Sequence, residues 1–290
     1  IDALKGIRDQ FLRFVKVIYV TVADEDDAYT IFETLNARGI DLSSYDLVRN
    51  SILKRLNKVH PNDEAKDRWK AIRENCKAAN VPPDTFLRHY WLSRFGNTTE
   101  DRLYKSFKLK QKDADFPESD KFLLELEAGS YKYLSIAVPV ETDWKEKHKK
   151  ANFRSLRALS LFRLTQVRPL LLAVLESSVM NDTDRKTLLT ILEHFHFSYT
   201  AVCSMPAYGL DRKYGKTARD LRNVTTRAAA KKIATNLADE LREKLPSLDA
   251  FQEHFAGLTY SYGDDSGKRL IQYFFEKYEA FLRKSTELVP

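Results

Sequence analysis

Helix-breaking residues are rare in this chain, and their scarcity constrains its fold more than any other feature. Of the 290 residues, nine are glycine and nine are proline. Because both residues destabilise the interior of an α-helix, a chain with so few of them allows long, uninterrupted helices. Apolar residues also recur at helical spacing over long stretches. We therefore expect a mainly α, multi-helix fold. After residue 60 the pattern predicts helices over 63–79, 83–95, 99–108, 119–135, 143–164, 168–179, 183–203, 213–223, 226–244, 247–256 and 267–284.

The beginning of the chain has a different pattern. The stretch FVKVIYVTVA, from Phe14 to Ala23, is rich in β-branched and aromatic residues and predicts one strand. A helix–loop–helix follows over residues 28–56, with Gly39 as a left-handed helix end and Ser43 or Ser44 as the next N-cap. We therefore expect two domains, a small α/β piece over residues 1–58 and an all-α piece over residues 59–290.

Composition excludes several classes of protein. The chain is 43% hydrophobic, which is enough to build a core, yet no apolar run approaches the roughly 18 residues of a membrane span. Its two cysteines, Cys76 and Cys203, supply neither a disulfide framework nor paired metal-ligand spacing. The N-terminus has no signal-peptide pattern and no starting Met. We expect a cytoplasmic protein without a membrane partner whose start has been cut or processed.

The clearest functional signal is a concentration of positive charge late in the chain. The net charge is +7, and residues 211–232 hold eight Lys or Arg against two Asp. Such an excess is typical of a surface that binds phosphates or an acidic partner, although a solvated helix face is the alternative. In one straight helix, six of these cations would share about a third of the circumference, but a break is expected at residues 223–226. The candidates for contact with a DNA backbone are Arg212, Lys213, Lys216, Arg219, Arg227 and Lys231.

Three other stretches imitate two kinds of known site, a phosphate loop and a metal site. GLDRKYGKT, from Gly209 to Thr217, has five residues between its glycines where a phosphate loop has four, and GDDSGKR, residues 263–269, has three. HFHF, from His194 to Phe197, suggests a metal pair, but side chains two positions apart on a helix point about 200° apart. We predict helix connections or caps in the first two stretches, and no metal site in the third.

A compact motif occupies residues 31–50, IFETLNARGIDLSSYDLVRN. It is similar to the conserved tail of the N-terminal domain in the GmrSD restriction endonuclease family. That tail reads roughly Ile-Phe-Glu-x-Leu-Asn-x-Arg-Gly, followed by Leu-Ser/Thr-x-x-Asp-Leu. Helix, loop and cap residues coincide between the two patterns. The helical remainder is similar in layout to the region that follows this domain in the family.

The resemblance implies a modification-dependent, antiphage DNA nuclease as the parent protein, with an NTP and a divalent metal as its cofactors. In the family, a ParB-like domain carries an Asp-Gly-Gln-Gln-Arg motif tied to nucleotide binding or hydrolysis, and an HNH-type domain carries a catalytic His. This sequence has no Asp-Gly-Gln-Gln-Arg. We therefore expect an inactive fragment with no catalytic residue and no cofactor. Residues 1–58 would end the N-terminal domain, and residues 59–290 would be a helical connector.

The motif loop supplies a second set of candidates. Asn36, Arg38 and Gly39 are possible contacts to the nucleotide site that the resemblance implies, with Gly39 reversing the chain. The alternative for Arg38 is an ion pair with Asp41 or Asp46. The expected partners are DNA, contacted through its backbone, and the flanking domains of the parent protein.

Two other functions compete with the connector that contacts DNA. One is a non-catalytic helical scaffold whose basic surface meets an acidic protein. The other is a self-contained nucleotide-dependent enzyme that uses residues 209–217.

Overall fold

The computed structural model describes residues 2–16, 19, 21, 43–56, 62–144, 150–259 and 265–283. These residues are mainly helical and contain no β-strand, so the predicted mainly α fold class is confirmed. The chain divides into two compact units, residues 1–43 and residues 44–290. No helix in the described ranges combines the length and the apolar character that a membrane crossing requires.

The first unit contains the helix α1 (Asp2–Phe14). Its apolar residues Leu4, Ile7 and Phe11 follow helical spacing and are exposed. The strand predicted over residues 14–23 is wrong wherever that stretch is described. Phe14 belongs to α1, and the described residues 15, 16, 19 and 21 form no strand. The motif-loop candidates Asn36, Arg38 and Gly39 lie outside the described residues.

The second unit begins with α3 (Ser44–Leu56), which packs on α4, α6 and α7. The two compact units therefore divide before α3, and the domain boundary predicted between residues 58 and 59 stays a prediction. The helices that follow are α4 (Asn62–Ala78), α5 (Pro83–Arg94), α6 (Leu103–Lys110), α7 (Ser119–Ala137), α8 (Lys150–Leu161), α9 (Arg168–Glu176), α10 (Asp182–His196), α11 (Leu210–Asn223), α12 (Arg227–Arg242), α13 (Leu248–Ala256) and α14 (Asp265–Leu282).

Most of these helices lie where the sequence predicts them, with several differences in their bounds. α6 begins four residues after its predicted start at residue 99, α11 begins three residues before its predicted start at residue 213, and α9 ends three residues before its predicted end at residue 179. The predicted helix 143–164 is a 3₁₀ turn, η1 (Glu141–Trp144), followed by α8, and the residues between them lie outside the described part. The predicted helix 183–203 ends as a π-helical turn, η2 (Phe197–Val202). α10 begins one residue before its predicted start at residue 183, and its N-cap is Asn181, whose side chain accepts a hydrogen bond from the Asp184 amide.

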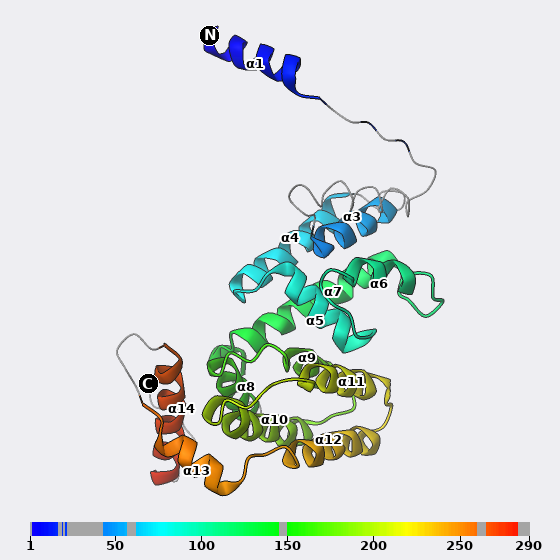
Figure 1. Ribbon diagram of the computed structural model, residues 1–290. Helices are drawn as coiled ribbons and strands as arrows, with labels where there is room; N and C mark the ends of the chain where they lie inside the picture. Colours follow the sequence, from blue (N-terminus) through cyan, green and yellow to red (C-terminus); the bar gives the residue numbers. More distant parts are fainter. Residues whose placement is uncertain are drawn as a thin grey trace. The chain divides into compact units, whose positions relative to one another are not determined.

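Aromatic residues of α5 form much of the core. Phe86, Tyr90 and Trp91 are buried, and Phe122 of α7 packs edge-on against Tyr90. The apolar stripe of α5 is therefore core, as its spacing predicts. In Figure 1, α5 lies above α9 and α11, and the contacts confirm that α11 packs against both α5 and α9. This arrangement fixes which face of α11 is free to meet another molecule.

The last helix, α14, is attached through a buried carboxylate. Glu193 on α10 is 1% exposed and accepts hydrogen bonds from Ser155 Oγ at 2.6 Å and Tyr273 Oη at 2.8 Å. Lys277 Nζ completes the site at 2.5 Å. Burial alone would raise the pKa of Glu193, but the charge of Lys277 and these hydrogen bonds hold the pKa below its ordinary value. The network therefore fastens α14 to α10 and α8.

Candidate nucleic-acid interface

The basic helix pair consists of α11 and α12. α11 is strongly amphipathic: Leu210, Tyr214, Ala218 and Leu221 are buried against α5 and α9. Gly215 is buried on this side of the helix, and a Cβ there would meet the Leu92 carbonyl oxygen at an ordinary contact distance of 3.6 Å. The cations of α11 must therefore take the rim and the outer side of the helix.

The expected break between the two helices is present. α11 ends at Asn223, and Thr226 is the N-cap of α12, accepting a hydrogen bond from the Ala229 amide. The six candidate cations therefore do not share one continuous helix face. The contacts of each cation therefore depend on the side of its own helix on which it lies.

Two arginines of α11 are used to cap another helix. Arg219 Nη1 donates to the carbonyl oxygen of Leu92 at 2.9 Å, and Arg222 Nε donates to that of Ser93 at 2.9 Å. Both carbonyls belong to the last turn of α5, where the helix itself offers no donor. Cations are also favoured there by the helix dipole. Part of the positive charge in this segment therefore has a structural cause.

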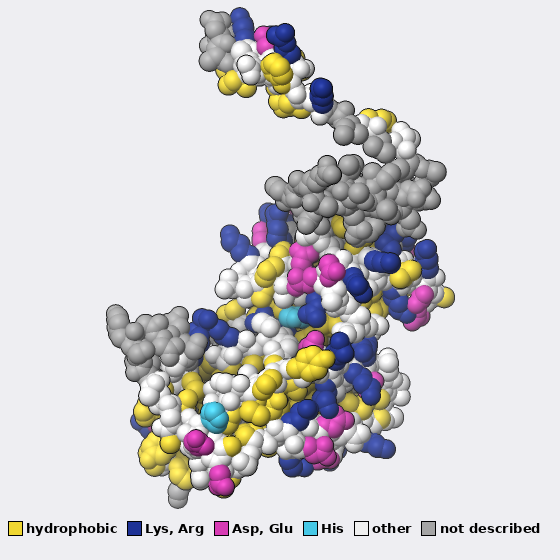
Figure 2. Space-filling model, in the orientation of Figure 1, with side chains coloured by type: hydrophobic (Ala, Val, Ile, Leu, Met, Phe, Trp, Pro, Cys, Tyr) yellow, Lys and Arg dark blue, Asp and Glu magenta, His cyan; other side chains and the backbone are white. Residues whose placement is uncertain are grey.

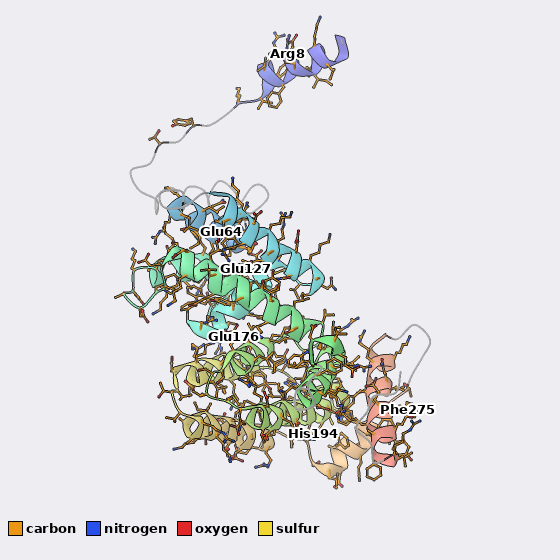
Figure 3. All side chains as sticks on the ribbon, turned by 180° about the vertical axis from the view of Figure 1, so that it is seen from behind. Arg8, Glu64, Glu127, Glu176, His194 and Phe275 are labelled. Carbon is orange, nitrogen blue, oxygen red and sulfur yellow. The ribbon has the colours of Figure 1, made fainter. Side chains whose placement is uncertain are left out.

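A partly buried ion network lies beside these caps. The carboxylate of Glu176 accepts hydrogen bonds from Arg222 Nη2 at 2.7 Å and from Arg94 Nη2 at 2.9 Å. Figure 3 labels Glu176 near the centre of the second unit, where its side chain is 16% exposed. Burial lowers the pKa of Arg222, and the neighbouring charge of Arg94 acts in the same direction. The Glu176 carboxylate offsets this repulsion, and the three side chains tie α5, α9 and α11 together.

Two more candidates are paired with acids from elsewhere in the second unit. Lys213 forms an ion pair with Glu240 of α12. Arg227 pairs with Asp184 of α10 at 2.6 Å, and the bond from Arg227 holds the pKa of Asp184 below its usual value. Lys213, Arg219 and Arg227 therefore have partners within the second unit, and contact of all six cations with DNA stays a prediction. These pairs and the pair with Glu176 reduce the excess charge of residues 211–232 from six to three.

Three candidates remain available. Arg212, Lys216 and Lys231 are exposed, and in the described part of the chain none of them has an ion pair or a side-chain hydrogen bond. Lys231 is close enough to Asp184 for its charge to lower the pKa of that carboxyl. Figure 2 shows Lys and Arg side chains gathered over α11 and the adjoining part of α12, with acidic side chains among them. The surface is therefore basic but interrupted.

Neither of the imitated sites is assembled in the described residues. Gly215, Lys216 and Thr217 lie inside α11, so the stretch from Gly209 is a helix start and not a loop around a phosphate. His194 is exposed and His196 is buried, which confirms that the two imidazoles point apart. The described residues hold no group of three or more His, Cys, Asp or Glu that could bind a metal ion.

Two buried histidines are the remaining titratable candidates. His89 lies 2.7 Å from Tyr133 Oη, which itself accepts a bond from Arg168 Nη1 at 3.1 Å. The tyrosine hydroxyl therefore donates to His89 Nδ1, and the imidazole is neutral. Burial lowers the pKa of His89 to about 3, and burial also lowers that of His196 to about 4. Both rings act as core hydrogen-bond partners, the second through Tyr214.

The chain matches no protein-family model, no curated protein and no solved structure. Inferences about its function therefore depend on its own residues and on the similarity of residues 31–50 to the GmrSD motif. Sequence reasoning did not identify Arg94, Glu176 or the capping role of Arg222. Their partners lie far away in the chain, so no local pattern could have indicated them.

Proposed function

We propose that this chain is part of a GmrSD-like, modification-dependent DNA nuclease. In this proposal it is the helical connector between the nucleotide-sensing and nuclease domains, and it touches the DNA backbone through the basic helix pair. The similarity of residues 31–50 to the GmrSD motif supports this proposal. The helix α3 begins at Ser44, where the motif places a helix start after its loop. The function of the parent protein, including its NTP and metal, enters only through this resemblance.

The observation that carries the DNA contact is the set of three unpaired cations. Arg212, Lys216 and Lys231 are exposed on the two helices, and none of them has an ion pair or a side-chain hydrogen bond in the described residues. Lys and Arg side chains without internal partners are suited to phosphate oxygens, which carry charge but no sequence information. We therefore expect sequence-independent binding that is weaker than six contacts would give.

Alanine variants test this proposal directly. Replacing the three cations together should reduce duplex binding at low salt by at least about tenfold, because three phosphate contacts are lost. Each lost contact should also lower the salt dependence of binding. The matched control removes three exposed cations of α4, which lie on another helix and leave the same net charge. The test variant is R212A/K216A/K231A, and the control is K70A/R73A/K77A.

The comparison separates a local contact from a general charge effect. The proposal predicts that the control binds the duplex nearly as well as the unmodified chain. An equal loss in both variants would mean that only net charge matters. Duplex binding that neither variant changes would show that the basic helix pair is not the contact.

A second function is favoured by one specific observation. α14 exposes three aromatic residues at a spacing of three, with Phe275 at 59%, Tyr278 at 49% and Phe281 at 77%. Figure 3 shows Phe275 on α14. Adjacent exposed aromatics are common at protein contact sites. If the chain shows no duplex binding at low salt, we propose the non-catalytic scaffold in place of the DNA connector.

A further inference from the structure

The loop before α11 displays an aromatic side chain. This loop, residues 204–209, lies between η2 and α11, and its Tyr208 is 89% exposed. No large apolar or aromatic residue described in the second unit is more exposed. The Tyr208 side chain forms no hydrogen bond and no ring contact with any described residue. Nearly the whole ring is therefore open to another molecule.

The backbone of this loop is held in place from the core. Tyr199 of η2 is 8% exposed, and its hydroxyl donates a hydrogen bond to the Pro206 carbonyl oxygen at 2.9 Å. The Tyr199 carbonyl oxygen in turn accepts a hydrogen bond from the Met205 amide at 2.9 Å. Proline also restricts the backbone within the loop. Because an aromatic ring on a fixed backbone loses little conformational entropy on binding, Tyr208 is well suited to contact a ligand.

Tyr208 lies close to two of the unpaired cations of the basic helix pair. Arg212 follows it by four residues, and Lys216 lies one helical turn after Arg212. An extended chain spans at most about 3.6 Å per residue, so the Cα atoms of Tyr208 and Arg212 are at most about 14 Å apart. One DNA strand rises about 3.4 Å per nucleotide, so this span corresponds to about four nucleotides. Figure 2 shows hydrophobic side chains next to the Lys and Arg side chains over α11. An aromatic ring and two cations therefore lie within reach of one strand.

We propose that Tyr208 stacks on an unpaired base of single-stranded DNA, while Arg212 and Lys216 contact phosphates of the same strand. This inference rests on the proposed DNA contact and adds the form of DNA that the surface prefers. A ring beside a basic surface is typical of single-strand sites, because every base has a π-face on which it can stack. Bases inside a duplex present only their edges in the grooves, so they offer the ring no face. The preference for a single strand therefore requires no reading of sequence.

The test measures binding of the whole chain to a single strand of mixed sequence and to a duplex of the same length, at several salt concentrations. Tyr208→Ala should weaken single-strand binding at least about fivefold, because alanine has no π-face. Duplex binding should fall by less than about twofold. The salt dependence of single-strand binding should not change in Tyr208→Ala, since stacking releases no counterions. Lys216→Ala should instead lower its slope by about 0.7.

Two further variants make the result specific to this ring. Tyr208→Trp should bind the single strand at least as tightly as the unmodified chain, because it keeps an aromatic face. Tyr131→Ala removes another exposed tyrosine, 54% exposed on α7, and should leave binding unchanged. Tyr208 is exposed and has no partner in the described residues, so its variants should fold like the unmodified chain.

Several results would overturn the proposal. They are single-strand binding that Tyr208→Ala does not weaken, an equal loss for the duplex, and an equal loss in Tyr131→Ala. A chain that binds the duplex but no single strand would also overturn it and would leave the proposed duplex contact intact. Binding to neither form of DNA would overturn both proposals.

Discussion

Replacing Arg222 by Ala should destabilise the second unit by about 2–3 kcal/mol. The substitution removes the bonds to Ser93 and to Glu176, and hydrogen bonds to charged groups contribute about 1.5–3 kcal/mol each in mutational series. The Arg222 side chain is 17% exposed, so solvent screens the ion pair only in part. Glu176 keeps Arg94, so its carboxylate is not left alone, and the cost stays below the 3–5 kcal/mol of a fully broken buried pair.

The same change at Lys216 should cost less than about 0.5 kcal/mol, because its side chain is exposed and has no partner in the described residues. Arg222→Lys should recover part of the loss, since it restores the charge but not the guanidinium fork. The midpoints of urea unfolding, taken with their slopes, give these differences in the free energy of unfolding. Equal stabilities for the Arg222→Ala and Lys216→Ala variants would refute the division of this segment into structural and free cations.

Three further outcomes follow from the core. Lowering the pH from 8 to 5 should lower the free energy of unfolding by about 2 kcal/mol for each of His89 and His196. Their folded pKa values, about 3 and about 4, lie below the unfolded value, so only the unfolded chain takes up these protons as the pH falls below 6.5. A flat urea midpoint over this range would contradict it. Glu193→Gln should weaken the attachment of α14 by about 1–3 kcal/mol and speed limited proteolysis within that helix; an unchanged cleavage pattern counts against the network. Gly129→Ala should lower the free energy of unfolding by about 1–3 kcal/mol, because the new Cβ would lie 2.9 Å from the buried ring of Tyr90. A gain in melting temperature would show instead that the higher helix propensity of alanine outweighs this contact.

The helices could be predicted from the sequence because their signals are local. Sparse glycine and proline, apolar spacing and caps such as Thr226 and Ser247 act within a few residues. The strand expected at residues 14–23 depended on residue preference alone, which is a weak guide because β propensity varies with context. Its described residues instead form the end of α1 and irregular chain.

The candidate site was predictable only in part, for a physical reason. Charge counting found the basic segment, but the role of each cation depends on what the fold brings beside it. Arg219 and Arg222 meet α5 across 127 and 129 residues of chain. Asp184 approaches Arg227 from α10 in the same way.

The salt dependence of duplex binding tests the central claim most directly. If Arg212, Lys216 and Lys231 are the phosphate contacts, the logarithm of the binding constant should fall with the logarithm of salt concentration with a slope of about −2.7. The slope should be the same for duplexes of unrelated sequence, because the contacts are to phosphates. A slope of about −5 would mean that the internally paired cations also reach DNA. No binding at about 50 mM salt would contradict the DNA contact altogether.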